Sequence, residues 1–173
     1  MTVAVAILDA DAVEACIGPL SDLLVDVVDA GASLGFWAPL AASRAQSYWR
    51  EIAAAARAGH SIVFVARAAG AVVGSIQLAP ATRDNSQHRA EVQKLIVHTA
   101  HRRRGIARQL LAAAHAEAKR RRRTLLVLDT RTGDPAESLY ASMGYTKIGI
   151  IPGYVIETDG SSNPTSVFYC HLP

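Results

Sequence analysis

A short basic segment, HRRRGIARQLL (residues 101–111), has the residue types of an anion-binding site. It combines four arginines, Arg102, Arg103, Arg104 and Arg108, with Gly105 at the start of an apolar helical pattern. The first turn of a helix has free N–H groups whose partial positive charge attracts anions. Gly105 and the small Ala107 keep the backbone accessible, and guanidinium groups bind phosphate oxygens. The segment therefore predicts a phosphate site, although it has neither the Gly-Lys-Ser/Thr of a P-loop nor the three-glycine dinucleotide spacing.

The positive charge of the chain is concentrated around this segment. Nine of the eighteen Lys and Arg residues lie in residues 101–123, whereas the net charge of the whole chain is only +3. Such a distribution indicates a local site or a helix end. Because residues 101–123 contain no Phe, Tyr or Trp for base stacking, we expect no nucleic-acid partner. The second basic run, Lys119 to Arg123, lies at a predicted helix C-terminus, where cations complement the dipole; contact with a cofactor phosphate or an acidic partner is the alternative.

Composition and the chain ends indicate where such a protein works. Two cysteines, Cys16 and Cys170, are too few for a metal cluster or a disulfide framework, and the six histidines show no metal-ligand spacing. The N-terminus lacks the basic region of a signal peptide, and no apolar run approaches the roughly 20 residues that span a bilayer. We expect a cytoplasmic protein with no metal and no membrane partner.

Hydrophobic periodicity predicts the elements that position the basic segment. We expect strands at residues 3–9, 61–68, 72–80, 90–98, 124–130, 145–154 and 165–172, with a polar turn at 158–164. Helices are expected at 11–29 (broken at Gly18-Pro19), 43–58 (capped by Ser43), 105–119 and from Asp134-Pro135 to Ser142. With 173 residues, half of them hydrophobic, the chain predicts a single domain over residues 1–173, a mixed α/β sandwich.

The strand, basic loop, helix and apolar strand carry a family resemblance. Arg102-x-x-Gly105-x-Ala107 fits Gln/Arg-x-x-Gly-x-Gly/Ala, and ESLYASMGY (137–145) follows the strand TLLVLDT (124–130). In this order the segments resemble the Gcn5-related N-acetyltransferase (GNAT) family. The resemblance implies a mostly antiparallel sheet with a splayed central parallel strand pair and helices on both faces. It also implies that acetyl-CoA is the co-substrate and that the loop and helix start hold its pyrophosphate.

Acyl transfer to an amine needs a base, an acid and a stabilised oxyanion. Glu91 at the start of one strand and Asp129 at the end of another are candidate bases, because functional groups of α/β sheets gather at strand ends. Alternatively, Glu91 pairs with Arg89 or Lys94, and Asp129 caps the following helix. The family places a tyrosine near the cofactor sulfur, which implies that Tyr140 is the acid; a plain core role is the alternative.

The same resemblance implies a cofactor site along one strand and helix. For the oxyanion it implies backbone amides near Leu95, Ile96 and Val97, where the strand splays from its neighbour. The full set of expected cofactor contacts is Leu95, Ile96, Val97, Arg102, Arg103, Arg104, Gly105, Ile106, Ala107, Arg108 and Tyr140. Gly133 stands where many relatives have an asparagine that contacts the pantetheine, which puts turnover in more doubt than binding.

Four further segments are similar to the tabtoxin-resistance acetyltransferases, which acetylate an amino-acid-like β-lactam. These are GASLGF (31–36), HRAEVQKL (88–95), LLVLDT (125–130) and IPGYVIETDG (151–160). The likeness implies that Glu91, Asp129 and Tyr140 are catalytic. It also implies an acceptor pocket for a small-molecule amine, bordered by Gly31, Ser33, Phe36, Trp37, Glu91, Asp129, Gly153 and Tyr154.

Other functions fit parts of the same pattern. A protein N-terminal or lysine acetyltransferase would use the same cofactor site and differ only in its acceptor loops, and a non-catalytic acetyl-CoA sensor would keep the binding residues alone. A Gly- and aromatic-rich loop at 31–40 favours a partly covered pocket, and therefore a small acceptor. A homodimer is common in the family, although no residue pattern identifies its interface.

Overall fold

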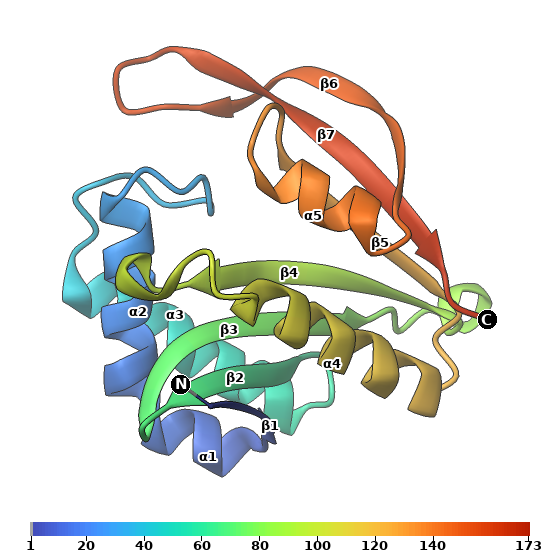
Figure 1. Cartoon of the computed structure of the whole chain (residues 1–173), viewed down its shortest axis with the longest axis horizontal. Helices are drawn as coiled ribbons and strands as arrows, with labels where there is room; N and C mark the ends of the chain where they lie inside the picture. Colours follow the sequence, from blue (N-terminus) through green and yellow to red (C-terminus); the bar gives the residue numbers. More distant parts are fainter. Residues whose placement is uncertain (1) are drawn as a thin grey trace.

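Seven strands form one sheet in the order β1-β2-β3-β4-β5-β7-β6 in the computed structural model, which describes residues 2–173 (Figure 1). The strands are β1 (Val3–Leu8), β2 (Ile62–Ala68), β3 (Ala71–Pro80), β4 (Arg89–Val97), β5 (Leu125–Arg131), β6 (Thr146–Ile156) and β7 (Ser162–His171). The α-helices are α1 (Ala10–Ala15), α2 (Ile17–Asp29), α3 (Ala42–Arg57), α4 (Ile106–Arg120) and α5 (Ala136–Ser142). Every neighbouring pair of strands is antiparallel except β4 and β5. The predicted mixed, mostly antiparallel sheet with a central parallel pair is confirmed.

The parallel pair is short, and this divides the sheet into two halves. Strands β4 and β5 are paired only from Arg89 opposite Leu125 to Glu91 opposite Val127. Beyond Glu91 the strands separate, and Figure 1 shows the two halves diverging from their shared end near the C-terminus. The unpaired half of β4 therefore faces an opening rather than a neighbouring strand.

Helices cover both faces of the first half because its central strands are apolar on both sides. In β2, Phe64 packs in a core cluster with Leu110 of α4, whereas the adjacent Val65 packs in a second cluster with Leu24 of α2 and Trp49 of α3. Successive strand residues point to opposite faces, so a continuous apolar run such as IVFV fills two cores. This arrangement fixes α4 against the strands that lead into the basic loop.

A glycine in β3 sets how closely α4 approaches the sheet. A Cβ atom on Gly74 would lie 3.0 Å from the Ile96 carbonyl oxygen and 3.0 Å from the Leu110 side chain. Because real Cβ contacts are longer, any side chain here would push α4 or β4 away. Gly74 therefore positions the helix start relative to β4.

Three expected boundaries were wrong. The break in the first helical region falls at Cys16, which ends α1 and precedes α2, while Gly18 and Pro19 lie in the first turn of α2. Proline is tolerated there because a first-turn N–H has no intrahelical partner. Ser43 lies inside α3, whose N-cap is Ala41. Strand β7 already begins at Ser162, so the turn between β6 and β7 is shorter than expected.

Within residues 2–173, no helix is both long and apolar enough to cross a membrane. In the same part of the chain, no group of three or more His, Cys, Asp or Glu side chains is arranged to hold a metal ion. The thiols of Cys16 and Cys170 are both free.

Candidate active site

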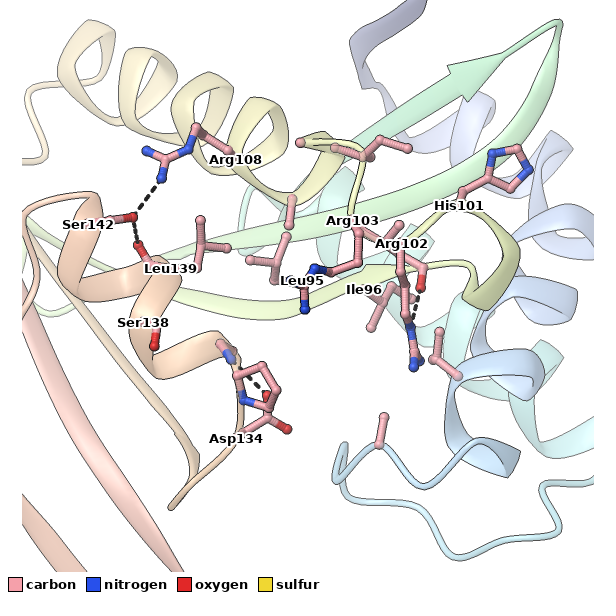
Figure 2. Close-up of a pocket in the computed structure, with 18 of the residues that line it drawn as sticks. Leu95, Ile96, His101, Arg102, Arg103, Arg108, Asp134, Ser138, Leu139 and Ser142 are labelled. Carbon is pink, nitrogen blue, oxygen red and sulfur yellow. Dashed lines mark hydrogen bonds between the residues drawn. The ribbon is translucent and has the colours of Figure 1, made fainter. Parts of the chain in front are cut away.

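A groove of about 610 Å³ runs between the start of α4, the unpaired half of β4 and helix α5 (Figure 2). We call it the α4–α5 groove. It includes nine of the predicted cofactor residues: Leu95, Ile96, Val97, Arg102, Arg103, Gly105, Ile106, Ala107 and Arg108. Arg104 and Tyr140 are not part of its lining. The groove is thus built by the segment that the sequence marked as an anion site and by the strand preceding it.

The start of α4 presents free backbone amides to the groove. Gly105 is the N-cap residue and has a left-handed conformation, with a φ of 76°, and no side chain caps the helix. An added Cβ at Gly105 would meet no atom within 4 Å, so the backbone conformation, rather than crowding by the chain, requires glycine here. An uncapped helix start beside open space fits the phosphate groups of a bound nucleotide.

The arginines of the loop differ in their surroundings. The Arg102 Nε donates a long hydrogen bond of 3.5 Å to the Val97 carbonyl oxygen, whereas the Arg103 side chain extends toward the middle of the groove (Figure 2). Arg108 bridges the two helices, because its guanidinium donates to the Ser142 hydroxyl at 2.7 Å and to the Met143 sulfur at 3.0 Å. Arg103 is therefore the arginine with the freest approach to an anion in the groove.

An aspartate on α2 holds the beginning of the basic loop. The Asp26 carboxylate accepts hydrogen bonds from the Thr99 backbone N–H at 2.8 Å and from the Thr99 hydroxyl at 2.7 Å. The two residues are 73 positions apart, and the periodic pattern of α2 gave no sign of this contact. Asp26 is a positioning residue that sequence reasoning missed.

A β-bulge shapes β4 where it passes the groove. The pairing with β3 changes from Gln77 opposite Gln93 to Ser75 opposite Ile96, so Lys94 and Leu95 together occupy the space of one partner residue. Lys94 has a φ of 50°, which is unusual for a residue with a side chain. The bulge interrupts the pairing around Leu95, the region where backbone amides were expected to face the reacting carbonyl.

A second cavity of about 400 Å³ lies on the other side of the bulge and contains both candidate bases. We call it the carboxylate pocket. Glu91 and Asp129 line it from the two diverging strands, and both are exposed. Among the described residues, no cation lies within 4.0 Å of the Glu91 carboxylate, so the alternative pairing with Arg89 or Lys94 does not form. Asp129 accepts a 3.0 Å hydrogen bond from the Thr165 hydroxyl rather than capping a helix.

Tyr140 lines the carboxylate pocket from α5 and is buried. Burial raises the pKa of its phenol well above the usual range, and the nearby negative charges of Asp134 and Asp129 act in the same direction. The phenol is protonated at neutral pH, as a general acid must be, and its raised pKa makes it a weaker acid than an exposed tyrosine. The ring also packs against Tyr145 and Phe168, so the structural role expected as an alternative is present as well.

The carboxylate pocket includes only some of the predicted acceptor residues. Ser33 and Tyr154 line it, whereas Gly31, Phe36, Trp37 and Gly153 do not. Phe36 packs edge-on against Tyr48 at 5.3 Å between ring centroids, and Trp37 donates from its indole N–H to the Ile156 carbonyl oxygen at 2.9 Å. Through these two contacts, Phe36 attaches loop 31–40 to α3 and Trp37 attaches it to β6. In this way Ser33, Leu34 and Gly35 come to border the pocket.

Tyr48 lines the carboxylate pocket and forms, with a residue buried behind it, a polar pair that sequence reasoning missed. The Tyr48 hydroxyl and the buried Gln77 side-chain amide hydrogen-bond to each other at 2.8 Å and 3.1 Å. Burial raises the pKa of Tyr48 to about 12. The two residues lie 29 positions apart, on α3 and β3, and only the tertiary structure brings them together.

The second basic run has a structural role at the end of α4. Arg120 and Arg121 donate to the buried Glu117 carboxylate at 2.6–2.7 Å, and they lower the pKa of that carboxyl to about 2. Arg123 donates to the backbone carbonyl oxygens of Ala81 and Gln87, between β3 and β4. These contacts support the helix-end interpretation of this run.

Comparisons with known proteins identify the family to which this fold belongs. The sequence model of the Acetyltransferase (GNAT) domain matches residues 59–147, which is more than half of the chain. The chain belongs to the GNAT acetyltransferase family. The predicted family resemblance is confirmed, and the matched residues include Glu91, Asp129, Tyr140 and the basic loop. The narrower likeness to tabtoxin-resistance enzymes stays a prediction.

One curated relative of the chain is also an N-acetyltransferase by name. An uncharacterised N-acetyltransferase in the hisH-hisA intergenic region of Azospirillum brasilense is 33% identical over 114 residues, which cover 65% of this chain and 66% of that protein. The chain therefore matches just under two thirds of the length of this curated relative.

Solved GNAT structures share the fold at low sequence identity. The structure of yncA from Salmonella typhimurium, solved with its cofactor acetyl-CoA, has a TM-score of 0.79 at 18% identity and covers 100% of this chain and 95% of its own. A ribosomal-protein-alanine N-acetyltransferase from Brucella melitensis has a TM-score of 0.78 at 24% identity, covering 96% and 99%. At such identities the likeness supports the fold alone.

Proposed function

We propose that this protein transfers the acetyl group of acetyl-CoA to the primary amine of a small molecule. The observation that carries the proposal is the connection between the two cavities at the β4–β5 splay. Four residues, Leu34, Leu95, Asp134 and Ala136, line both the α4–α5 groove and the carboxylate pocket. An acyl donor in one cavity and an amine in the other would meet at the bulge of β4, so the two reactants are brought together by position.

The α4–α5 groove has the donor set that acetyl-CoA needs. The free amides at Gly105 and in the first turn of α4 would hold the pyrophosphate, with Arg103 and Arg102 at the rim. On the side that faces β5, the backbone from Leu95 to Val97 has no neighbouring strand, and it would bind the pantetheine arm there as an added strand does. When bound, acetyl-CoA supplies a thioester whose acyl carbon accepts the amine.

The carboxylate pocket holds the kinds of side chain that acyl transfer needs. Glu91 or Asp129 would take the proton of the incoming ammonium, directly or through water, and leave a nucleophilic amine. Tyr140, whose pKa is raised by burial, keeps a proton that it can give to the departing thiolate. Backbone N–H groups near Leu95 would stabilise the negative charge on the carbonyl oxygen.

The dimensions of the carboxylate pocket favour a small acceptor over a protein. Its volume of about 400 Å³ lies near the lower end of the range of small-molecule sites. Loop residues 33–35 and Tyr154 with Val155 of β6 border it on two sides, which narrows the approach for a polypeptide. The tabtoxin-resistance likeness suggests an amino-acid-like β-lactam as one acceptor, and hence a role in toxin resistance. A protein N-terminus or lysine is the second candidate.

The decisive experiment follows free thiol release from acetyl-CoA with a panel of acceptors. The panel contains amino acids, amino-acid-like β-lactams, simple amines and peptides with free N-termini. We expect thiol release that depends on a small amine. Of the two variants Glu91→Gln and Asp129→Asn, the one with the larger loss of kcat would identify the base. We expect Tyr140→Phe to lower kcat about 10²- to 10⁴-fold while the calorimetric Kd for acetyl-CoA stays unchanged.

Tyr169→Phe is the matched control, because Tyr169 lies on β7 outside both cavities. Release with peptides alone would select the protein-acetylating alternative. Tight acetyl-CoA binding without release on any amine would select the sensor, and absence of binding would contradict the whole proposal. A cytoplasmic location and a homodimer stay predictions.

A further inference from the structure

Lys94 is one of two basic residues, with Arg131, that line the carboxylate pocket. It lies on β4 at the bulge, three residues after Glu91, and lines the carboxylate pocket together with Glu91 and Asp129. Its left-handed backbone, with a φ of 50°, is strained for a residue with a Cβ atom. Glycine would adopt this conformation without strain, so folding alone does not explain a lysine here.

The Lys94 ammonium has no ion-pair partner within residues 2–173. No carboxylate oxygen lies within 4.0 Å of its Nζ, although Asp129 and Glu91 are close enough to raise its pKa. Burial outweighs these charges, and the pKa of Lys94 is lower than usual. A half-buried cation without a direct partner is a group that a bound anion would stabilise.

The other basic residue of the pocket, Arg131, has two carboxylates nearby. The Arg131 guanidinium lies 3.8 Å from the Asp134 carboxylate and 4.0 Å from that of Glu157. Asp129, in turn, is oriented by the Thr165 hydroxyl. Of the two basic residues that line the pocket, Lys94 is therefore the one with no carboxylate oxygen within 4.0 Å.

We propose that Lys94 binds an acidic group of the acceptor, so that the acceptor is a zwitterion of the amino-acid type. Glu91 and Asp129 face the ammonium end of such a molecule, and Lys94 faces its carboxylate. Two opposite charges in a pocket of about 400 Å³ fix the orientation of a small acceptor and select against plain amines. This inference rests on the proposed function for its chemistry and adds the residue that determines acceptor specificity.

The test compares each L-amino acid with its carboxamide, which keeps the amine and removes the negative charge. The inference expects the wild-type protein to prefer the carboxylate form at least about tenfold in kcat/KM, mainly through KM. Lys94→Met should abolish this preference, while activity with the carboxamides changes little. Lys94→Gly should give the same result and keeps the left-handed bulge, so a folding defect is excluded. Lys147→Met, outside the pocket, should leave the preference intact.

Calorimetric titration of the same pairs into the protein saturated with CoA supplies a readout that needs no turnover. If no amine is acetylated but carboxylate binding exceeds carboxamide binding and depends on Lys94, the inference stands and the proposed function fails. If Lys94→Met lowered kcat/KM equally for each amino acid and its carboxamide, the inference would be overturned. The lysine would then only balance the negative charges of Glu91 and Asp129. Loss of the preference in Arg131→Met alone would also overturn it.

Discussion

Asp26 shows how a single residue outside the groove determines the position of the basic loop. Its carboxylate accepts both the backbone N–H and the hydroxyl of Thr99, four residues before Arg103. Asp26 is not part of the groove lining, so we expect it to affect anion binding only through the position of the loop.

We expect Asp26→Asn to raise the Kd for acetyl-CoA about three- to tenfold, because the amide keeps one acceptor and loses the charge-assisted bonds. Asp22→Asn is the matched control, since Asp22 lies one turn earlier on α2, is exposed and accepts no hydrogen bond among the described residues. Calorimetric titration with acetyl-CoA measures the Kd of both variants. Equal Kd values for the wild type and Asp26→Asn would show that the loop holds its shape without this tether.

At the scale of elements, the approach of α4 to the sheet depends on Gly74. Helix α4 crosses β3 and β4 where Gly74 leaves room for Ile96 and Leu110, and its N-terminus thereby reaches the unpaired half of β4. The distance between helix and strand sets the width of the groove at its inner end. Packing in β3 and the geometry of the site are therefore coupled.

We expect Gly74→Ala to lower the free energy of unfolding by about 1–3 kcal/mol, because the new methyl group would overlap a backbone carbonyl that is unable to rotate away. Chemical denaturation monitored by circular dichroism measures this change. Gly18→Ala provides the opposite control. A Cβ there meets no atom within 4 Å, and alanine favours the helix by about 0.5–1 kcal/mol. An unchanged stability of Gly74→Ala would show that α4 shifts freely.

At the scale of the whole molecule, the two halves of the sheet are joined at one end. At the closed end of the sheet, β4 and β5 are paired and Arg123 contacts the segment between β3 and β4. At the open end, where β4 and β5 have separated, lie the two cavities. Glu117 belongs to the closed end through its bonds with Arg120 and Arg121. The acid stability of the molecule therefore depends partly on this cluster.

The folded protein lowers the pKa of Glu117 from 4.5 to about 2, so its carboxylate stabilises the fold above pH 4.5. That contribution is lost as the pH falls from 4.5 toward 2, where the carboxyl takes up a proton in the native state too. We expect Glu117→Gln to lower the free energy of unfolding by about 1–2 kcal/mol at pH 7, with the difference shrinking below pH 4.5.

Urea denaturation between pH 7 and pH 3 measures this prediction. Glu14→Gln is the control, because Glu14 pairs with Arg57 on the surface, where both side chains are more than half exposed and the pair contributes little. A difference between wild type and Glu117→Gln that does not vary with pH would contradict the assignment of the stabilisation to the charged carboxylate.

The amino-acid sequence by itself determined the features that depend on local patterns. Periodicity and turn residues located the strands and most helices, and the glycine and arginines at residues 102–108 marked the anion site. Local rules were enough for this prediction because the free amides of a helix start and neighbouring arginines can be recognised within one short segment. The carboxylates were found because strand ends are recognisable in the sequence.

Only the tertiary structure decided what depends on contacts between distant segments. The bulge that places Lys94 in the carboxylate pocket, the Asp26–Thr99 tether and the separation of Phe36 and Trp37 from the pocket all involve elements far apart in the chain. The sequence predicted the loop at 31–40 as a pocket border, but packing against Tyr48 and Ile156 selected its first half. These contacts depend on how complete helices and strands pack against one another, and the residue pattern of a single segment does not predict that packing.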